Sequence, residues 1–453
     1  MEKNLTTGSV LKTVIYFSLP YLLSYFLQTL YGMADLFIIG QFNGVESTTA
    51  VSVGSQVMHM ITVMIVGLAM GTTVMIGQAV GAKKKAEASR AIGNTIILFM
   101  IIAVVLAVCL LLLVRPIVSI MSVPEEAVQG TISYLTVCFI GIPFITAYNI
   151  ISSIFRGLGD SRSPMYFVAV ACVLNIALDY LFIGSMGLGP VGAALGTTLS
   201  QTCSVVVALI VIRIRKAGIS LKREDFKLRK STLSGLLKVG VPVAVQDGLI
   251  QVAFLVITVI ANQRGLNDAA AVGIVEKLIC ILFLVPSSML STVSALSAQN
   301  IGANRYDRAH QTLRYAIMIA VGWGILVCIV MQISAETFVG LFTSDGEEVV
   351  RLGSQYLRGY VFDCIFAGIH FSFSGYFCGC GKSGISFLHN LLAIVCARIP
   401  LVYLASKMFA DTLLPMGLAT ATGSLLSVII CIFAYLWIRR GEKKTAGSLS
   451  KIV

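Results

Sequence analysis

Charged residues are scarce in this chain. Asp, Glu, Lys and Arg make up 12% of its 453 residues and only four residues are histidine, whereas 57% are hydrophobic. Soluble domains carry roughly one-quarter charged residues, so this composition excludes a water-soluble fold. The apolar residues instead form runs of about 20 or more, the length of a helix that crosses a membrane. Strands that alternate over about ten residues are lacking, which excludes a membrane β-barrel.

Sequence signals of enzymes and of protein processing are also missing. The chain contains neither a nucleophile elbow nor a zinc-binding HExxH motif. The segment Gly379 to Gly384 resembles the end of a phosphate-binding loop, but Gly375 lies one residue too far upstream and no strand precedes it, so it predicts a turn between helices. No small-residue cleavage site follows the first apolar run, which we expect to remain in the protein. We therefore expect no catalytic site and no cofactor.

The apolar runs predict an all-α integral membrane protein with twelve transmembrane helices. The predicted spans are Val14 to Ile39, Thr49 to Ala79, Ala91 to Val114, Val128 to Ile154, Pro164 to Ile183, Val191 to Ile212, Leu236 to Ala261, Ala269 to Ala298, Tyr315 to Ile333, Val349 to Phe377, Gly384 to Phe409 and Met416 to Ile438. Most of the eleven cysteines fall inside these runs, where they pack as small residues rather than forming disulfides.

The distribution of Lys and Arg predicts the orientation. If the N-terminus faces the cytoplasm, 26 of the 33 basic residues lie in inner segments, nine of them between Arg213 and Lys238. Basic loops are retained on the cytoplasmic side, so both termini are expected there. The net charge of +12 then belongs to the inner membrane face, where it contacts anionic lipid. Nucleic-acid binding is not expected.

An internal repeat divides the chain into two halves. GQAVGA, which begins at Gly77, recurs as AQNIGA from Ala298, and the pairs Gln78/Gln299 and Gly81/Gly302 are both 221 residues apart. Pro20 and Pro242 are 222 residues apart, so the offset is nearly constant along the chain. We therefore predict an N-terminal six-helix lobe at 1–213, a cytoplasmic linker at 214–235 and a C-terminal lobe with a basic tail at 236–453.

These motifs resemble those of the multidrug and toxic compound extrusion family. The resemblance rests on a proline early in the first helix, Gln28, Asp35 and Gly40, the two GQ-type motifs, and FRGLGDSRSP from Phe155 to Pro164. It covers essentially the whole chain. It implies a V-shaped bundle of two lobes that opens alternately to either side of the membrane. The implied activity is export of organic, often cationic or amphipathic, compounds in exchange for an inward proton or sodium ion.

Ionisable residues inside the predicted spans are candidates for the coupling site, because charge within a membrane is costly. Asp35 and Asp179 each lie five residues before a glycine at the outer end of their helices, and Asn175 lies one turn before Asp179. Thr197 is at the same depth. Two nearby carboxyl groups of this kind share a proton or, with further oxygens, bind a hard cation. Alternatively, these residues only cap helix ends near the lipid headgroups.

The family resemblance implies a role for the same residues. In its DinF-like branch the cation site has an aspartate on helix one, an asparagine and an aspartate on helix five and a threonine on helix six. These positions match Asp35, Asn175, Asp179 and Thr197, and the carbonyl of Ala193 is a weaker match. No other metal site is expected.

A second set of residues is a weaker candidate for the substrate cavity: Gln28, Asp247, Glu276, Asp363 and Arg398. Glu276 with Lys277, or Asp363 with Arg398, could equally be ion pairs that hold helices together. The glutamate expected for a NorM-like site is absent after Pro242, where Ile250 or Gln251 stands instead. Pro20 interrupts the hydrogen bonds of helix one and is either a hinge for coupling or a structural kink.

Two other classes remain open. A lipid-linked saccharide flippase of the same superfamily would share the two lobes, but its cavity usually carries more arginines than Arg358 and Arg398. An intramembrane enzyme would need catalytic groups that converge near one membrane face, and none is visible. We expect an exporter in the inner membrane of a prokaryote that acts on small organic molecules, contacts membrane lipids and works as a monomer.

Overall fold

The computed structural model describes residues 4–214, 221–343 and 346–449, in which helices predominate and no β-strand occurs. Internal contacts divide the chain into two compact units, one of Met1–Gly248 with Ala298–Arg308 and one of Leu249–Ser297 with Ala309–Val453. The lobe boundaries predicted from the repeat are not tested by this grouping and stay a prediction. Part of the predicted linker, at 215–220, lies outside the described residues.

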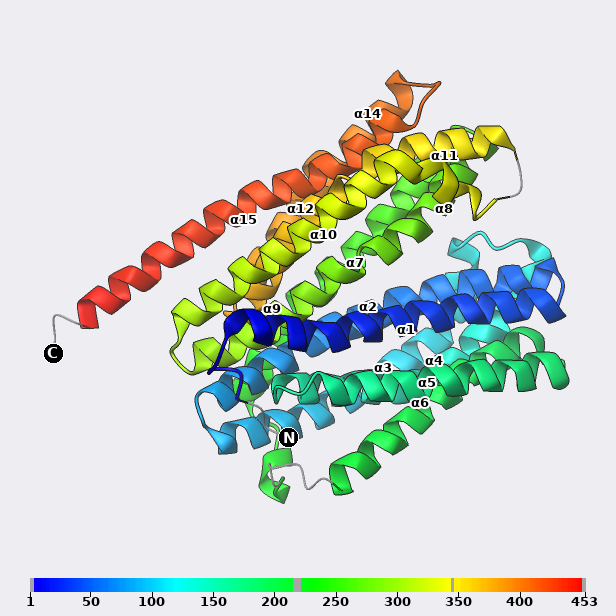
Figure 1. Ribbon diagram of the computed structural model, residues 1–453. Coiled ribbons are helices and arrows are strands. Elements are labelled where there is room, and N and C mark those ends of the chain that lie inside the picture. Colours follow the sequence, from blue (N-terminus) through cyan, green and yellow to red (C-terminus); the bar gives the residue numbers. More distant parts are fainter. Residues whose placement is uncertain (1–3, 215–220, 344–345, 450–453) are drawn as a thin grey trace. The chain divides into compact units, whose positions relative to one another are not determined.

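The first unit is built mainly from six long helices (Figure 1). They are α1 Val10–Phe42, α2 Val45–Gly81, α3 Lys85–Ile120, α4 Glu125–Gly157, α5 Arg162–Asp179 with its π-helical continuation η1 Tyr180–Ser185, and α6 Gly189–Ile214, followed by the 3₁₀ turn η2 Arg223–Phe226 and the first part of α7 Lys230–Asn262. Helix α4 packs against α2, α3 and α6, while α1, α5 and α6 contact one another. This second group of three helices carries the predicted coupling residues.

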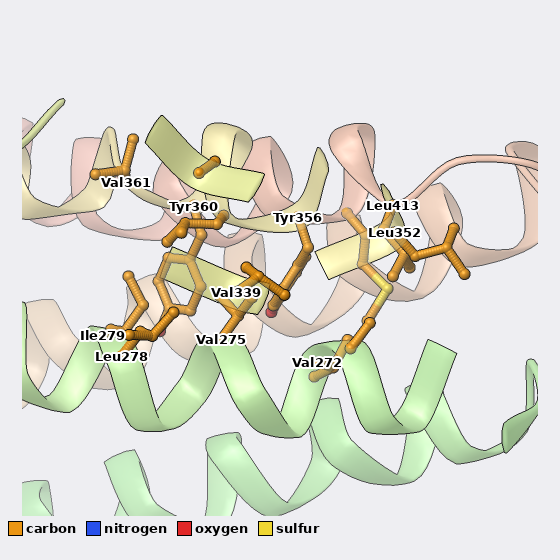
Figure 2. Packing of buried hydrophobic residues seen from close by; sticks show 14 of the residues in the cluster. Val272, Val275, Leu278, Ile279, Val339, Leu352, Tyr356, Tyr360, Val361 and Leu413 are labelled. Atoms are coloured by element: carbon orange, nitrogen blue, oxygen red, sulfur yellow. The ribbon is translucent and has the colours of Figure 1, made fainter. Parts of the chain in front are cut away.

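The second unit begins within α7 and contains shorter helical segments. They are α8 Leu266–Leu282, the first part of α9 Leu284–Gly302, most of α10 Tyr306–Gly340, α11 Glu347–Tyr360, α12 Asp363–Gly379, α13 Ser383–Ala393, the π-helical η3 Ile394–Arg398, α14 Ile399–Met408 and α15 Leu414–Leu449. Figure 2 shows the core of this unit, where Val272 and Val275 of α8 lie near Leu352 and Tyr356 of α11.

The predicted all-α membrane architecture is confirmed. Ten helices of the described residues are long and apolar enough to span a membrane, and two bent helix pairs raise the number to as many as twelve. The bent pairs are α8 with α9 and α11 with α12, each with an angle of 41° at its break. Each bent pair corresponds to one predicted span, Ala269 to Ala298 for the first and Val349 to Phe377 for the second.

The break between α8 and α9 follows from a proline. Pro286 has no N–H group, so it cannot donate to the carbonyl of Leu282 four residues earlier. The indole Nε1 of Trp323 on α10 donates to this carbonyl instead, at 3.0 Å. A freed carbonyl in a membrane needs such a partner, because no water is present to replace the lost hydrogen bond.

The break between α11 and α12 contains no proline. Here too a side chain of α10 donates a hydrogen bond to a backbone carbonyl at the break. Gln332 on α10 donates from Nε2 to the carbonyl of Arg358 at 2.8 Å. The chain then tightens, since Cys364 and Ile365 donate to carbonyls only three residues earlier. Helix α10 therefore supplies the side-chain donor at both breaks.

The turns that follow the repeated motifs have matching backbone conformations. Lys83 and Asn304 follow the two GQ-type motifs and both have left-handed conformations, with φ of 59° and 56°. Gly159 and Gly381 also match, with φ of 87° and 70°. The segment that resembles a phosphate-binding loop is therefore a helix-to-helix turn, as the sequence predicts, and glycine suits its positive φ.

Candidate functional site

The structure brings the four predicted coupling side chains together inside the first unit. Thr197 of α6 donates from its hydroxyl to Oδ2 of Asp35 on α1, at 3.3 Å. The Asp35 side chain also contacts Asn175 and Asp179 of α5. Asp35, Asn175 and Asp179 are only 4%, 1% and 0% exposed, so none of them reaches the surface of the unit. We refer to these four residues as the acidic cluster.

Most polar atoms of the acidic cluster lack a hydrogen-bond donor or acceptor. Oδ1 of Asp35, both carboxyl oxygens of Asp179 and both side-chain polar atoms of Asn175 are buried without a hydrogen-bond partner among the residues that the structure describes. Carboxyl oxygens that meet one another can form a hydrogen bond only if one of them carries a proton. Buried polar groups left in this state are costly, and a proton or a small cation between them would remove that cost.

A glycine on α6 makes room for the Asp179 carboxyl group. A Cβ atom placed on Gly196 would overlap Oδ1 of Asp179. The carboxyl group therefore lies directly against the backbone of α6, one residue before Thr197. Gly196 was not among the residues predicted from the sequence, although a glycine next to a candidate ligand is a signal of close backbone approach. Ala193 is fully buried on the same helix.

The local backbone around Asp179 is also unusual. Helix α5 ends at Asp179 and continues as the π-helical segment η1. At the end of this segment the amide of Met186, the C-cap residue, donates to the carbonyl of Leu181, five residues earlier. π-Helical turns are rare and occur frequently at functional sites. The predicted fifth span, Pro164 to Ile183, is thus α-helical up to Asp179 and π-helical from Tyr180 onward.

The second set of predicted residues forms no single group. Gln28 of α1 is partly buried, and Oδ1 of Asp247 on α7 accepts from Gln246 at 3.5 Å. Both belong to the first unit, whereas Glu276, Asp363 and Arg398 belong to the second. Glu276 accepts from the hydroxyl of Thr258 at 3.3 Å. Within the described part of the chain it has no ion pair with Lys277.

Asp363 and Arg398 form the ion pair that the sequence analysis offered as one alternative. Nη2 of Arg398 lies 2.9 Å from Oδ2 of Asp363 and 2.9 Å from the hydroxyl of Ser424. The Arg398 side chain is 11% exposed and the Asp363 side chain is 0% exposed, so the pair is buried within the second unit. Arg398 is the last residue of the π-helical segment η3 and also lines a cavity of about 50 Å³ with His370, Asn390 and aromatic side chains.

Pro20 lies inside α1 and is buried. The helix continues through it, and the Pro20 carbonyl accepts from the hydroxyl of Ser24 at 2.7 Å. Neither the hinge nor the plain kink is tested by this geometry, so the role of Pro20 stays a prediction.

The architecture and the cluster can be compared with known proteins. The MatE family model matches residues 20–181 and 242–404, two segments whose starts are 222 residues apart. The chain is 30% identical over 346 residues to the probable multidrug resistance protein YoeA of Bacillus subtilis, with 75% of each chain covered. It is 28% identical over 440 residues to the probable multidrug resistance protein YpnP of the same organism, with 97% of each covered.

Solved structures support the same fold. A multidrug resistance MATE transporter of the MOP superfamily in an outward-facing conformation superposes with a TM-score of 0.91 at 23% identity, covering 97% of this chain and 98% of that one. A MOP superfamily transporter from Pyrococcus furiosus gives a TM-score of 0.89 at 23% identity, with 96% of each chain covered.

The helical fold and these relatives define a multi-pass membrane transporter rather than an enzyme. The chain belongs to the MatE family, the multidrug and toxic compound extrusion transporters. This membership confirms the resemblance found in the sequence. It also rules out the alternative prediction that the protein is an intramembrane enzyme. The relatives do not single out the DinF-like branch, which stays a prediction.

Proposed function

We propose that this transporter is an antiporter that exports organic, often cationic or amphipathic, compounds in exchange for an inward proton or sodium ion. The observation that supports the proposal is the acidic cluster, in which two carboxyl groups, an amide and a hydroxyl meet inside the membrane unit with most of their polar atoms unpaired. A buried set of this kind is stable only when it holds a proton or a cation.

The same oxygens can serve either ion. Asp35 and Asp179 can share one proton, because two adjacent carboxylates in a low-dielectric site do not both ionise cheaply. Alternatively, their oxygens with those of Asn175 and Thr197, and the carbonyl of Ala193, surround a sodium ion as oxygen ligands surround hard cations. Among the residues that the structure describes, no three His, Cys, Asp or Glu side chains form another metal-binding group.

Transport would proceed by alternating access, with the ion and the organic compound bound at different stages. Bending of α1 at Pro20 would connect occupancy of the acidic cluster to the rest of the lobe. Gln28 and Asp247 of the first unit and, separately, Glu276 of the second unit are candidates for contact with the substrate. The pair of Asp363 and Arg398 would hold α12 and η3 in place. One monovalent cation that moves down 100 mV releases about 2.3 kcal/mol, enough for a gradient of roughly fifty-fold in a neutral substrate.

The proposed setting follows from the bacterial relatives. Several of them are named multidrug resistance or multidrug export proteins, such as MepA of Staphylococcus aureus, which is 26% identical over 410 residues with 89% of each chain covered. We infer that this chain works as a monomer in the inner membrane of a prokaryote, surrounded by lipid, with both termini in the cytoplasm.

Purified protein in liposomes tests the coupling. We expect uptake of an organic cation such as ethidium when a gradient of protons or of sodium is imposed without nucleotide. The variants Asp35→Asn and Asp179→Asn should lose uptake, because each removes an ionisable group without a change in size. Applying each gradient alone identifies the ion.

The control is Asp268→Asn, an acidic residue in the first turn of α8 that pairs with Arg264 and lies outside the cluster. It should retain uptake. Full gradient-driven uptake by Asp35→Asn, or uptake that needs ATP, would contradict the proposal.

A further inference from the structure

A cavity of about 250 Å³ lies in the first unit, at the start of α1 and the turn before α5. Its lining includes Ser9, Lys12, Thr13, Ser161 and Arg162. Lys12 and Asp35 are separated by about 35 Å along α1, at 1.5 Å per residue, so this cavity is distinct from the acidic cluster. The volume is far above the ~15 Å³ that one buried water needs.

The two cations of this cavity have no acidic partner among the described residues. Neither Lys12 nor Arg162 takes part in an ion pair within the described ranges. The nearest acid in sequence, Asp160, does not line the cavity. Its carboxylate already accepts from the amides of Arg162 and Ser163, at 3.0 and 3.3 Å, and from the hydroxyl of Ser163 at 2.7 Å. The cavity therefore has a net positive charge.

Hydrogen-bond donors add to this charge. Ser161 is only 6% exposed and lines the cavity, and its hydroxyl makes no hydrogen bond with the described residues. Ser9 is the N-cap residue of α1 but its side chain does not cap the helix, and the first turn of α1 contains no acidic residue. The free N–H groups and the positive end of this 33-residue helix therefore favour an anion nearby.

The surface of α1 beside the cavity is apolar. Tyr16, which also lines the cavity, is 63% exposed, and Leu19 and Leu23, which follow it at helical spacings of three and four residues, are 52% and 44% exposed. In a membrane such a stripe faces acyl chains. A phosphate group held at the cavity could therefore extend directly into two chains along α1, which a free ion could not do.

We propose that this cavity binds the phosphate group of an anionic phospholipid whose acyl chains lie along the exposed stripe of α1. Lys12 and Arg162 provide the charge, Arg162 with a planar set of donors suited to phosphate oxygens. Ser9 and Ser161 donate hydroxyl hydrogen bonds. The lipid would connect the N-terminal end of α1, before Pro20, to the N-terminal end of α5. This site does not depend on the proposed transport function.

The test is direct binding to the full-length protein purified in detergent, measured by native mass spectrometry and thermal unfolding. Phosphatidylglycerol is compared with phosphatidylcholine of the same acyl chains and with inorganic phosphate. We expect phosphatidylglycerol to bind and raise the unfolding temperature most. The variant Lys12→Gln/Arg162→Gln should bind it about 30-fold more weakly, since each basic residue contributes roughly fivefold.

Controls separate the site from general charge. Lys85→Gln/Arg90→Gln removes the same charge elsewhere in the first unit and should bind normally, as should Lys12→Arg, which keeps the charge at position 12. If the double glutamine variant fails to fold, Lys12→Gln alone, at an exposed position, should still weaken binding roughly fivefold. Equal binding of the two lipids, an equal effect of inorganic phosphate, or an equal loss in the Lys85/Arg90 variant would overturn the proposal.

Discussion

The buried acids of the two units differ in how their charge is balanced. Asp363 has a fixed cation, since Arg398 lies 2.9 Å away. Asp35 and Asp179 form no ion pair with any residue that the structure describes, and three of their four carboxyl oxygens have no hydrogen-bond partner. An acid with a permanent partner holds helices together, whereas acids without one can exchange a proton or a cation during transport.

The close approach of Gly196 to Asp179 gives a sharp test at this scale. In Gly196→Ala the new methyl group overlaps the Asp179 carboxyl group, so this carboxyl group must shift from its position in the acidic cluster. We expect gradient-driven uptake to fall by about 10- to 100-fold, the scale of effects from a displacement of about 1 Å. Folding should be intact, because alanine is favoured over glycine in a helix.

Gly32→Ala on α1 is the matched control. A Cβ atom there would meet nothing within 4 Å, so uptake should be unchanged. The measurement is the initial rate of uptake in liposomes at equal protein content. Normal uptake by Gly196→Ala would show that the position of Asp179 is not critical for coupling.

At the scale of elements, the second unit contains two broken helix pairs whose freed carbonyls are both satisfied from α10. Trp323 donates to Leu282 and Gln332 donates to Arg358. Pro286 explains the first break, because it removes one donor from the helix ladder. The second break has no proline, so its position depends on tertiary contacts, among them the close packing of Gly359 against the α15 backbone at Leu414.

Removal of one of these donors should destabilise the protein. Trp323→Phe leaves the Leu282 carbonyl unpaired within the membrane, and we expect the free energy of unfolding to fall by about 1 to 3 kcal/mol. The other tryptophan is the control: Trp437 is 69% exposed, and Trp437→Phe should change stability by less than about 0.5 kcal/mol. Thermal unfolding in detergent measures both. Equal stability of the two variants would refute the role given to the indole N–H.

At the scale of the whole molecule, the distribution of basic residues predicts the orientation in the membrane. In a cysteine-free background, cysteines at Glu46 and Glu347 should react with an impermeant maleimide added to intact cells. Cysteines at Lys85 and Tyr306 should react only after the membrane is opened. All four positions are exposed in the structure, so burial does not limit the reaction. The reverse labelling pattern would overturn the predicted orientation.

The sequence by itself determined the membrane class, the all-α architecture and the repeated motifs. These features depend on composition and on local order: a run of apolar residues forms a membrane helix whatever its neighbours are, because its backbone must bond to itself. The repeat could be read from motifs alone, and the turns at Lys83 and Asn304 have the same conformation in the structure. The four residues of the acidic cluster were also predicted. Asp35 and Asp179 are charged residues inside apolar runs, and Asn175 and Thr197 were predicted from their spacing and depth relative to these two.

The tertiary structure decided what depends on contacts between distant segments. It brought Asp35, Asp179 and Thr197 into contact, paired Asp363 with Arg398, and placed Gly196 against a carboxyl group. It also located the helix breaks and the cavity at Lys12 and Arg162. The physical reason is that a membrane helix satisfies its own backbone within one segment, whereas the partner of a buried side chain lies on another helix, whose rotation and depth are set by packing.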